Sequence, residues 1–523
     1  MMLKYLLLIS FLLVHIGSSA QNGIRLNSPT ALPSLTLINK VDTTYLINNC
    51  GFIVNQWEVD ARIPHPKLLP NGNILSLASS SVIIETDWEG NTVSETAANL
   101  PAGEKLIYEL IKLPDGNYLS VGRKLLNIEG FYDIGYDPNN VSNNREMPRE
   151  IDMIYEIKNG TGEILWQWNI GDHVIQERDS TAPNYGIIKE HPELINIDAI
   201  SDWDWRVDES FMINSFDYNP SLDQIVLSIR KMSEFMIIDH STTTTEAAGH
   251  EGGDSGKGGD ILYRWGNPEN YDSGNESDRF LHYQHNPNWI THGEHLGKII
   301  TFDNGFGRSG NYSTIPIVDP PIDAQGNYLK APEVAFGPEI PEPFLERIVD
   351  DNLYSTYTSG VRLLENGNYF ITEGATAELK EVSVDGELVW EFKVPNANFI
   401  YRTEKYPLNY PGFFGKDLNA TTKRIPSANS DYNCTLYTTG IQENNLEKVT
   451  VHYNANDGVL KIKNELSKNL NYQLFDSHGR LLIKANNAFI EHLISIPYLP
   501  AGFYILFIIA EDGKRLQKKI LKF

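Results

Sequence analysis

A short turn motif recurs along the chain and restricts the folds that the chain can adopt. A leucine, an Asn-Gly or Asp-Gly pair and a second apolar run follow one another at Leu69–Leu75, Leu113–Leu119 and Leu364–Phe370. The first two copies begin 44 residues apart. Such pairs between apolar runs predict β-hairpins, because both central residues of the turn tolerate positive φ. One hairpin signal in about 40 to 45 residues is typical of propeller blades.

A second recurring feature supports the same architecture. Glycine-led turns feed strand-like segments rich in tryptophan, at Trp88–Gly90, Gly162–Trp166, Asp260–Trp265 and Gly386–Trp390. Two weaker units lie at 223–227 and 297–302. We therefore expect an all-β, six-bladed propeller, with a solenoid or a sandwich as alternatives. Long insertions, such as 127–149 and 241–259, should lie at the ends of the central channel, where propellers usually bind ligands.

The N-terminus has the pattern of a secretory signal peptide at residues 1–20. Lys4 precedes the apolar run Leu6–Ile16, and the small residues Ser18–Ala20 follow it. The run is shorter than the roughly 20 residues that a membrane span requires, and no other stretch is long enough. We therefore predict export and no transmembrane span after signal removal. An N-terminal anchor helix is the alternative.

The C-terminal segment differs from the rest in charge. Residues 449–523 hold ten Lys or Arg and six Asp or Glu, whereas the whole chain carries −25. Such a change predicts a domain boundary, so we expect a body at 21–424, a polar linker at 425–448 and a small β-sandwich at 449–523. The sandwich resembles the C-terminal sorting domain of type IX secretion cargo, through Leu474–Leu481, Leu499–Tyr504 and Lys518–Phe523. This resemblance implies a Bacteroidetes-type cell, the type IX secretion machinery as a partner, and a secreted or cell-surface location. An ordinary immunoglobulin-like module is the alternative.

The overall acidity excludes one class of partner. A charge of −25 argues against nucleic-acid binding through a general basic surface. An anionic substrate would need a local cationic pocket instead. The two cysteines, Cys50 and Cys434, either form one disulfide or remain as two buried thiols.

Common catalytic motifs are missing from the sequence. It contains no Walker motif and no Gly-x-Ser-x-Gly elbow between a strand and a helix. Four histidines lie within 14 residues, at His282, His285, His292 and His295. On a strand, residues three apart face opposite sides, so one strand cannot aim all four at one ion. We therefore expect neither a metal nor a cofactor.

The segment 237–260 is rich in hydroxyls, glycines and cationic or imidazole groups. It contains His240, His250 and Lys257. Backbone donors and one cation in such a loop can surround an anion, although a plain connecting loop has the same composition.

Several motifs in the body are similar to the bacterial aryl-sulfate sulfotransferase family. They are 213–220 with 223–225, 239–268, Gln284-His285, 302–308, and Ser359-Gly360 with the Leu364 turn. The similarity covers about 44–420. It implies a six-bladed propeller that moves a sulfuryl group from an aryl sulfate to a phenolic acceptor. It also implies a covalent histidine intermediate and no nucleotide sulfate donor.

The resemblance assigns roles to individual residues. His285 is the candidate nucleophile or sulfate ligand, and Arg308 is the candidate sulfate clamp. Further candidates for substrate binding are His240, His250, Lys257 and Asn304.

Two positions depart from the family pattern. Met212 stands where the family has histidine, and Asn286 stands where members often have an acid. Methionine neither attacks as imidazole does nor donates a strong hydrogen bond. Three functions stay open: an active sulfotransferase, a catalytically impaired ligand-binding member, and a structural cell-surface propeller.

Overall fold

The computed structural model describes residues 22–437, apart from 41, 60–64, 137–148, 200–210, 332–333 and 342–352. Between 449 and 522 it describes the strands and a few further residues. The predicted signal peptide and residues 438–448 of the predicted linker lie outside these ranges. No helix in the described part is long and apolar enough to cross a membrane.

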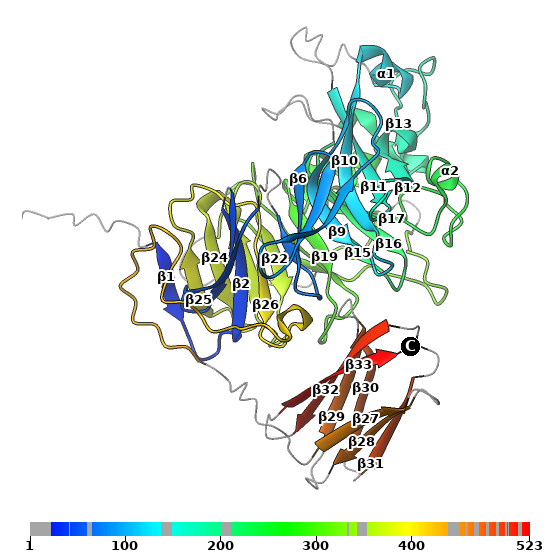
Figure 1. Ribbon diagram of the computed structural model, residues 1–523. Helices are drawn as coiled ribbons and strands as arrows, with labels where there is room; N and C mark the ends of the chain where they lie inside the picture. The colour runs from blue at the N-terminus through cyan, green and yellow to red at the C-terminus, as the bar shows by residue number, and fades with distance from the viewer. Residues whose placement is uncertain are drawn as a thin grey trace, which may run out of the picture.

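The body is built from six sheets that follow one another along the chain (Figure 1). The first contains β26 (Glu404–Pro407), β2 (Ser34–Lys40), β3 (Thr43–Asn48) and β4 (Ile53–Glu58). The second contains β5 (Lys67–Leu68), β6 (Ile74–Ser79), β7 (Val82–Thr86) and β8 (Thr92–Ala97). The third contains β9 (Glu104–Lys112), β10 (Tyr118–Leu126), β11 (Arg149–Ile157) and β12 (Ile164–Asn169).

The remaining three sheets contain four, three and five strands. The fourth contains β15 (Ile213–Asn219), β16 (Gln224–Ile229), β17 (Glu234–Asp239) and β18 (Tyr263–Trp265). The fifth contains β19 (His285–Trp289), β20 (Ile299–Phe302) and β21 (Ile317–Val318). The sixth contains β22 (Gly360–Leu363), β23 (Tyr369–Glu373), β24 (Glu378–Val382), β25 (Leu388–Lys393) and β1 (Gly23–Asn27). A small parallel pair joins β13 (Val174–Ile175) to β14 (Ile195–Asn196). The described residues contain two short α-helices, α1 (Ile128–Asp133) and α2 (Thr244–Ala247). The predicted all-β, propeller-like architecture is confirmed.

The three predicted hairpin turns occupy equivalent places, between the first and second strands of their sheets. In each, the leucine N–H donates to the asparagine carbonyl four residues later, at 2.8 Å. Gly72, Gly116 and Gly367 have φ of 89°, 97° and 84°. The preceding Asn or Asp does not have positive φ, and its side-chain oxygen accepts the N–H two residues on. The turn therefore needs one left-handed residue, not the two that a two-residue hairpin requires.

Strands from both ends of the body close the ring of sheets. β1 pairs with β25 in the sixth sheet, and β26 pairs with β2 in the first. Cys50 and Cys434 form a disulfide with a Cα–Cα distance of 5.6 Å. Ile425, from the predicted linker, is buried, and Tyr432 packs against the same core. The described part of the predicted linker is thus attached to the body.

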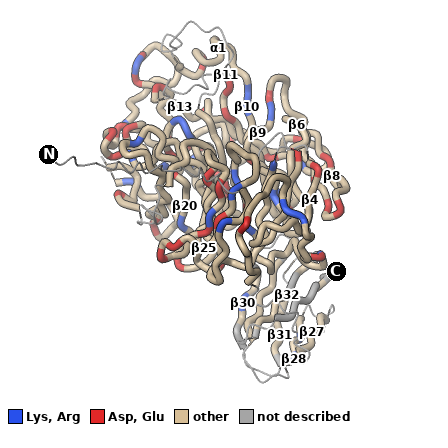
Figure 2. Tube along the Cα trace, turned by 90° about the vertical axis from the view of Figure 1, so that its left-hand side faces the viewer, with Lys and Arg blue, Asp and Glu red and all other residues tan. Residues whose placement is uncertain are grey.

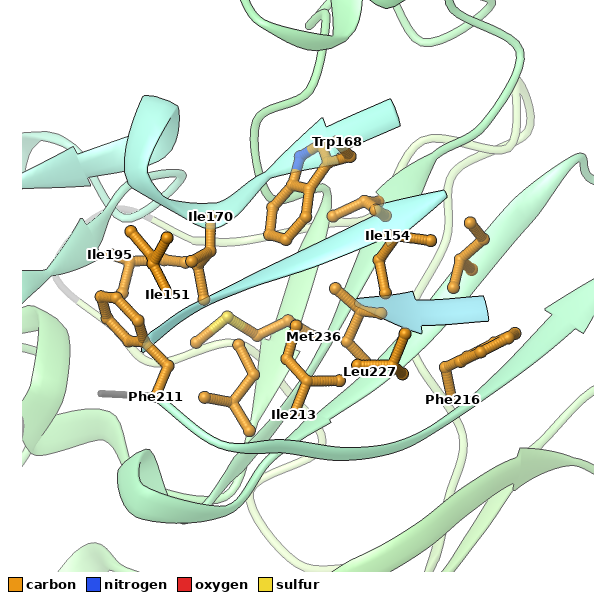
Figure 3. Packing of buried hydrophobic residues seen from close by; sticks show 14 of the residues in the cluster. Ile151, Ile154, Trp168, Ile170, Ile195, Phe211, Ile213, Phe216, Leu227 and Met236 are labelled. Atoms are coloured by element: carbon orange, nitrogen blue, oxygen red, sulfur yellow. The ribbon is translucent and has the colours of Figure 1, made fainter. Parts of the chain in front are cut away.

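The cores lie between neighbouring sheets. Figure 3 shows side chains of the third and fourth sheets packed face to face, among them Ile154, Trp168, Ile213, Phe216, Leu227 and Met236. Full burial of an apolar side chain of this size contributes about 1.5 to 3 kcal/mol. Contacts of this kind fix the orientation of each sheet relative to the next.

The C-terminal residues form two sheets around a separate core. One contains β27 (Val449–Asn454), β28 (Val459–Asn464) and β31 (Glu491–Ser495). The other contains β30 (Leu481–Asn487), β29 (Leu470–Asp476), β32 (Gly502–Ala510) and β33 (Arg515–Lys522). Leu460 and Leu474, one from each sheet, belong to the same buried cluster.

Candidate functional site

Charged residues on the first strands of the sheets contact one another. Lys67 Nζ of β5 lies 2.7 Å from Glu109 Oε1 of β9. The Arg362 guanidinium of β22 lies 3.7 Å from Glu404 of β26 and 4.0 Å from Asp217 of β15. Because these residues come from five sheets, the first strands face a common axis. Basic and acidic segments accordingly lie close together near the middle of the body in Figure 2.

Three of the titratable side chains along this axis, those of Glu109, Arg402 and His65, are buried. Arg402 donates to Glu109. His65 Nε2 lies 3.2 Å from Glu404, but burial and the charge of Arg402 lower the pKa of His65, so this contact is a hydrogen bond of a neutral ring. Burial raises the pKa of Glu109, but Arg402 and Lys67 outweigh burial and lower it to about 2. Removing one member of such a pair leaves an uncompensated charge, so these contacts hold the sheets in a fixed arrangement.

His285, the predicted nucleophile or sulfate ligand, begins β19 and is 3% exposed. Its Nδ1 lies 2.6 Å from Asn304 Oδ1. Asn304 Nδ2 donates to the carbonyls of Ser355 and Thr358, at 2.6 and 3.0 Å. Those two acceptors fix the amide so that its oxygen faces the ring, and Nδ1 must therefore carry the proton. In the neutral ring, Nε2 then holds the lone pair.

The surroundings keep His285 neutral. Burial lowers its pKa to about 3, and the nearby charge of Arg230 and Arg402 acts in the same direction. The hydrogen bond to Asn304 opposes this shift only in part. An unprotonated imidazole at neutral pH is the form that attacks an electrophile.

Aromatic residues lie beside this histidine. Tyr401 and Tyr108 stack with ring centroids 5.9 Å apart, and Met212 packs in the same buried cluster. The Tyr401 ring meets His285 edge to face at 6.5 Å, and its hydroxyl donates to the Asn214 carbonyl. Two stacked phenols next to a neutral imidazole form an environment suited to an aryl ring.

Several residues around His285 have unusual backbone conformations. Non-glycine residues with positive φ include Tyr108 (63°), Met212 (63°), Tyr283 (60°), Asn286 (58°), Thr358 (54°) and Ser359 (89°). Each costs of order 1 to 3 kcal/mol and persists only when its surroundings enforce it, which is common at functional sites.

Glycine at position 360 is required by close packing in the same region. A Cβ at Gly360 would lie 2.5 Å from Arg402 Cδ and 2.8 Å from Asn286 Oδ1. Asn286 Oδ1 accepts from the Val361 N–H, and its own N–H donates to Ser215. Asn286 thus ties β19 to β15 and β22.

Met212 occupies the position where histidine was expected from the family pattern. Its N–H donates to Asp152 Oδ2 at 2.8 Å, and its sulfur lies 3.7 Å from Arg230 Nη1. The position is therefore at the site, but its side chain is a weak acceptor only.

Arg308, the predicted sulfate clamp, is engaged by protein groups. Its Nη2 contacts Asp303, the Phe280 carbonyl at 2.6 Å and His282 Nδ1 at 3.2 Å. Burial and the charge of Arg308 lower the pKa of His282 to about 4. Among the described contacts, none joins Arg308 to His285; the two are linked through the neighbouring residues Asp303 and Asn304.

His240 directly follows the last residue of β17, at the end of the fourth sheet that is remote from His285. Its Nδ1 lies 2.7 Å from Asp223 and its Nε2 lies 3.3 Å from Glu156. Burial opposes protonation, but the two carboxylates outweigh it and raise the pKa of His240 to about 9. His240 and His285 lie beside opposite ends of β16, roughly 15 Å apart at about 3.3 Å per residue.

His250 and Lys257 also lie away from His285. The exposed His250 contacts Asp260 at 2.8 Å, and the Lys257 N–H donates to Ser255 Oγ at 3.4 Å. The fold therefore unites His285, Asn304, Met212 and Asn286 from the predicted set. Arg230, Tyr401 and Arg402 complete the site, and no motif in the sequence indicates them.

Fold and site together describe a propeller-like protein with a neutral, buried imidazole at one end of a charged axis. The model of the arylsulfotransferase (ASST) family matches residues 24–328, more than half of the chain. The chain belongs to this family.

Similarity to individual proteins is low. No curated protein matches the chain. A solved protein of unknown function from Bacteroides caccae is 12% identical, with a TM-score of 0.38, over 72% of this chain and 99% of that one. A virginiamycin B lyase from Staphylococcus aureus is 9% identical, with a TM-score of 0.30, over 75% and 86%.

Proposed function

We propose that the protein transfers a sulfuryl group between phenols, with His285 as the group that carries it. Family membership supports the reaction class. The fixed amide of Asn304 supports the choice of His285 as the nucleophile. It places the proton of the ring on Nδ1 and leaves the Nε2 lone pair for attack. This arrangement is the observation on which the proposal depends.

The reaction has two steps. In the first, His285 Nε2 bonds to sulfur while the bond from sulfur to the aryl oxygen breaks, and the donor phenolate leaves with that electron pair. In the second, the oxygen of an acceptor phenol bonds to sulfur, its proton passes to solvent, and the N–S bond breaks. Splitting the transfer in this way lowers each barrier, and no nucleotide is required.

Arg402 and Arg230 are the cations best placed to hold the sulfate oxygens. Both are close enough to lower the pKa of His285. Arg402 Nε and Nη1 are buried and have no hydrogen-bond partner among the described residues. Guanidinium donors suit sulfate oxygens, and their contribution is largest where water is excluded. The stacked Tyr108 and Tyr401 would contact the aryl ring.

Arg308 then has a different role from the predicted clamp. Its guanidinium is occupied by Asp303 and His282, so we assign it to positioning the turn that carries Asn304. Its effect on the reaction would pass through the orientation of His285.

A second function, ligand binding without turnover, is favoured by two observations. Met212 contributes no imidazole to the site, and His285 is 3% exposed. In this case the same cationic and aromatic groups would bind an aryl anion.

We also propose that the protein is exported and reaches the cell surface or the medium. The predicted signal peptide at 1–20 and the landmarks of the C-terminal segment support this location. Type IX secretion would then require residues 449–523.

The test is phenol release from an aryl sulfate by the purified chain, with and without an acceptor phenol. We expect release to rise with the acceptor, to disappear in His285→Gln and to persist in the matched control His240→Gln. Saturable binding of the aryl sulfate by the parent without release would favour the second function. Full activity of His285→Gln would refute the role of this residue.

A further inference from the structure

Two histidines and one aspartate converge at a place that the proposed reaction does not use. His173 ends the short 3-10 helix η2 (Ile170–His173) after β12, whereas His250 and Asp260 lie in the insertion between β17 and β18. Their ligand atoms all lie within 4.8 Å of one another. Both Nδ1 atoms face the same oxygen, Asp260 Oδ1, at 2.9 Å from His173 and 2.8 Å from His250.

The contacts of His173 restrict where its protons can be. Nε2 lies 2.8 Å from the Ala247 carbonyl, which can only accept, so Nε2 carries a proton. In the neutral ring, Nδ1 then presents a lone pair to the carboxylate of Asp260. Two lone pairs at this distance repel one another unless a cation, either a proton or a metal ion, lies between them.

The His173 ring is held in place by its surroundings, as the rings of metal-binding histidines usually are. The ring is fully buried and stacks on Trp168, with centroids 5.4 Å apart. Metal-binding histidines usually donate their second N–H to a carbonyl or carboxylate, as His173 does to Ala247. A Cβ at position 259 would lie 2.6 Å from His173 Nε2, so Gly259 lets the loop close over the ring.

The opposite side of the cluster is open. The His250 side chain is 60% exposed, so an ion has access from solvent and water can complete its coordination. Zinc ligands at about 2.0 to 2.2 Å in tetrahedral geometry stand roughly 3.3 Å apart. The separations of Asp260 Oδ1 from the two Nδ1 atoms, 2.9 and 2.8 Å, are both shorter than this. Because the His173 ring is fully buried, binding requires the Asp260 carboxylate and the exposed His250 ring to shift outward by about half an ångström.

We propose that His173, His250 and Asp260 bind one divalent transition metal ion of the Zn²⁺ type. Two imidazoles and a carboxylate form a donor set that suits Zn²⁺ and its first-row neighbours. The ion joins the insertion of the fourth sheet to the end of the third. Its role is structural, because the cluster lies by the edge of the fourth sheet where β17 ends, away from His285.

The experiment uses the full chain after treatment with a chelator, and Zn²⁺ as the probe in isothermal titration calorimetry. We expect one equivalent to bind tightly and the thermal midpoint to rise with Zn²⁺. His250→Gln, a change at an exposed residue, should weaken this binding at least tenfold. The matched control is His191→Gln, because His191 is also an exposed histidine paired with a carboxylate, Glu193, at 2.9 Å. The control should bind Zn²⁺ as the parent does.

Replacement by Co²⁺ gives an independent readout. Visible absorption bands of a low-symmetry site with nitrogen ligands should appear in the parent and be lost in His250→Gln. Two results would overturn the proposal: the absence of a tight equivalent, or a tight equivalent that His250→Gln leaves unchanged. The second would place the ion at another histidine of the chain.

Discussion

The buried, neutral state of His285 makes the stability of the protein depend on pH in a defined window. The pKa of His285 falls from 6.5 to about 3 on folding. The unfolded chain therefore binds a proton below pH 6.5 that the folded chain does not bind until about pH 3. Stability that is fully present above pH 6.5 is lost as the pH falls toward 3.

The size of the effect follows from the shift. Each pKa unit corresponds to about 1.4 kcal/mol, so His285 alone removes about 3 kcal/mol between pH 7.5 and 4.5. The loss reaches about 5 kcal/mol below pH 3. In His285→Gln the titrating group is absent, and the free energy of unfolding should fall by about 3 kcal/mol less over the same interval. Other buried acids titrate in both proteins and cancel in the comparison.

The assay is urea unfolding of the parent and the variant at matched pH values. His240→Gln is the control of opposite sign, because the folded-state pKa of His240 is raised to about 9. Its contribution is fully present below pH 6.5 and is lost as the pH rises through 9. His240→Gln should therefore flatten the profile between about pH 6.5 and 9. It also removes the hydrogen bond that lowers the pKa of Asp223, so the acid limb of its profile changes as well. If the free energy of unfolding changed with pH in the same way in the parent and in His285→Gln, the buried, neutral state of His285 would be refuted.

Three further predictions concern separate parts of the chain. Cys50→Ser should lower the free energy of unfolding in urea by up to about 5 kcal/mol, because the Cys50–Cys434 disulfide closes a loop of 384 residues in the unfolded chain; equal stability of the parent with and without reductant would contradict this. Deletion of 449–523 should leave a folded body in the periplasm, detected by cell fractionation, whereas normal surface levels would exclude a sorting role. Met212→His should raise phenol release if the rest of the site is intact, since it adds an imidazole beside Arg230; unchanged kcat/KM would show that this position does not limit the reaction.

Local signals in the sequence predicted the repeated parts of the fold. The Asn-Gly and Asp-Gly turns depend on a few neighbouring residues, and they occupy equivalent places in their sheets. Trp166, Trp265 and Trp390 lie in the fourth strands β12, β18 and β25, whereas Trp88 lies in the turn before β8. Such local signals could not predict how the first and last sheets of the body are joined. The partner of β1 lies more than 360 residues away in β25, and no local pattern specifies that pairing.

The site was predictable in part for the same reason. His285 and Asn304 stand in recognisable short motifs. Arg230 lies in a 3-10 helix between β16 and β17, and Arg402 lies in the loop before β26, so only the fold brings them to the site. Arg308 illustrates the opposite case: a motif identified the residue, but its contact with Asp303, five residues earlier, is seen only in the fold. His173 and Asp260 are 87 residues apart, so only the fold brings them together.

The most direct test of the central claim is to trap the sulfuryl group on the protein. The parent is mixed with an aryl sulfate labelled with radioactive sulfur, without an acceptor phenol, and quenched under alkaline conditions that preserve a sulfated imidazole. Peptide mapping should then place the label on the peptide that contains His285, and addition of a phenol before quenching should remove it. Label on a different residue, or turnover with equal labelling in His285→Gln, would contradict the account.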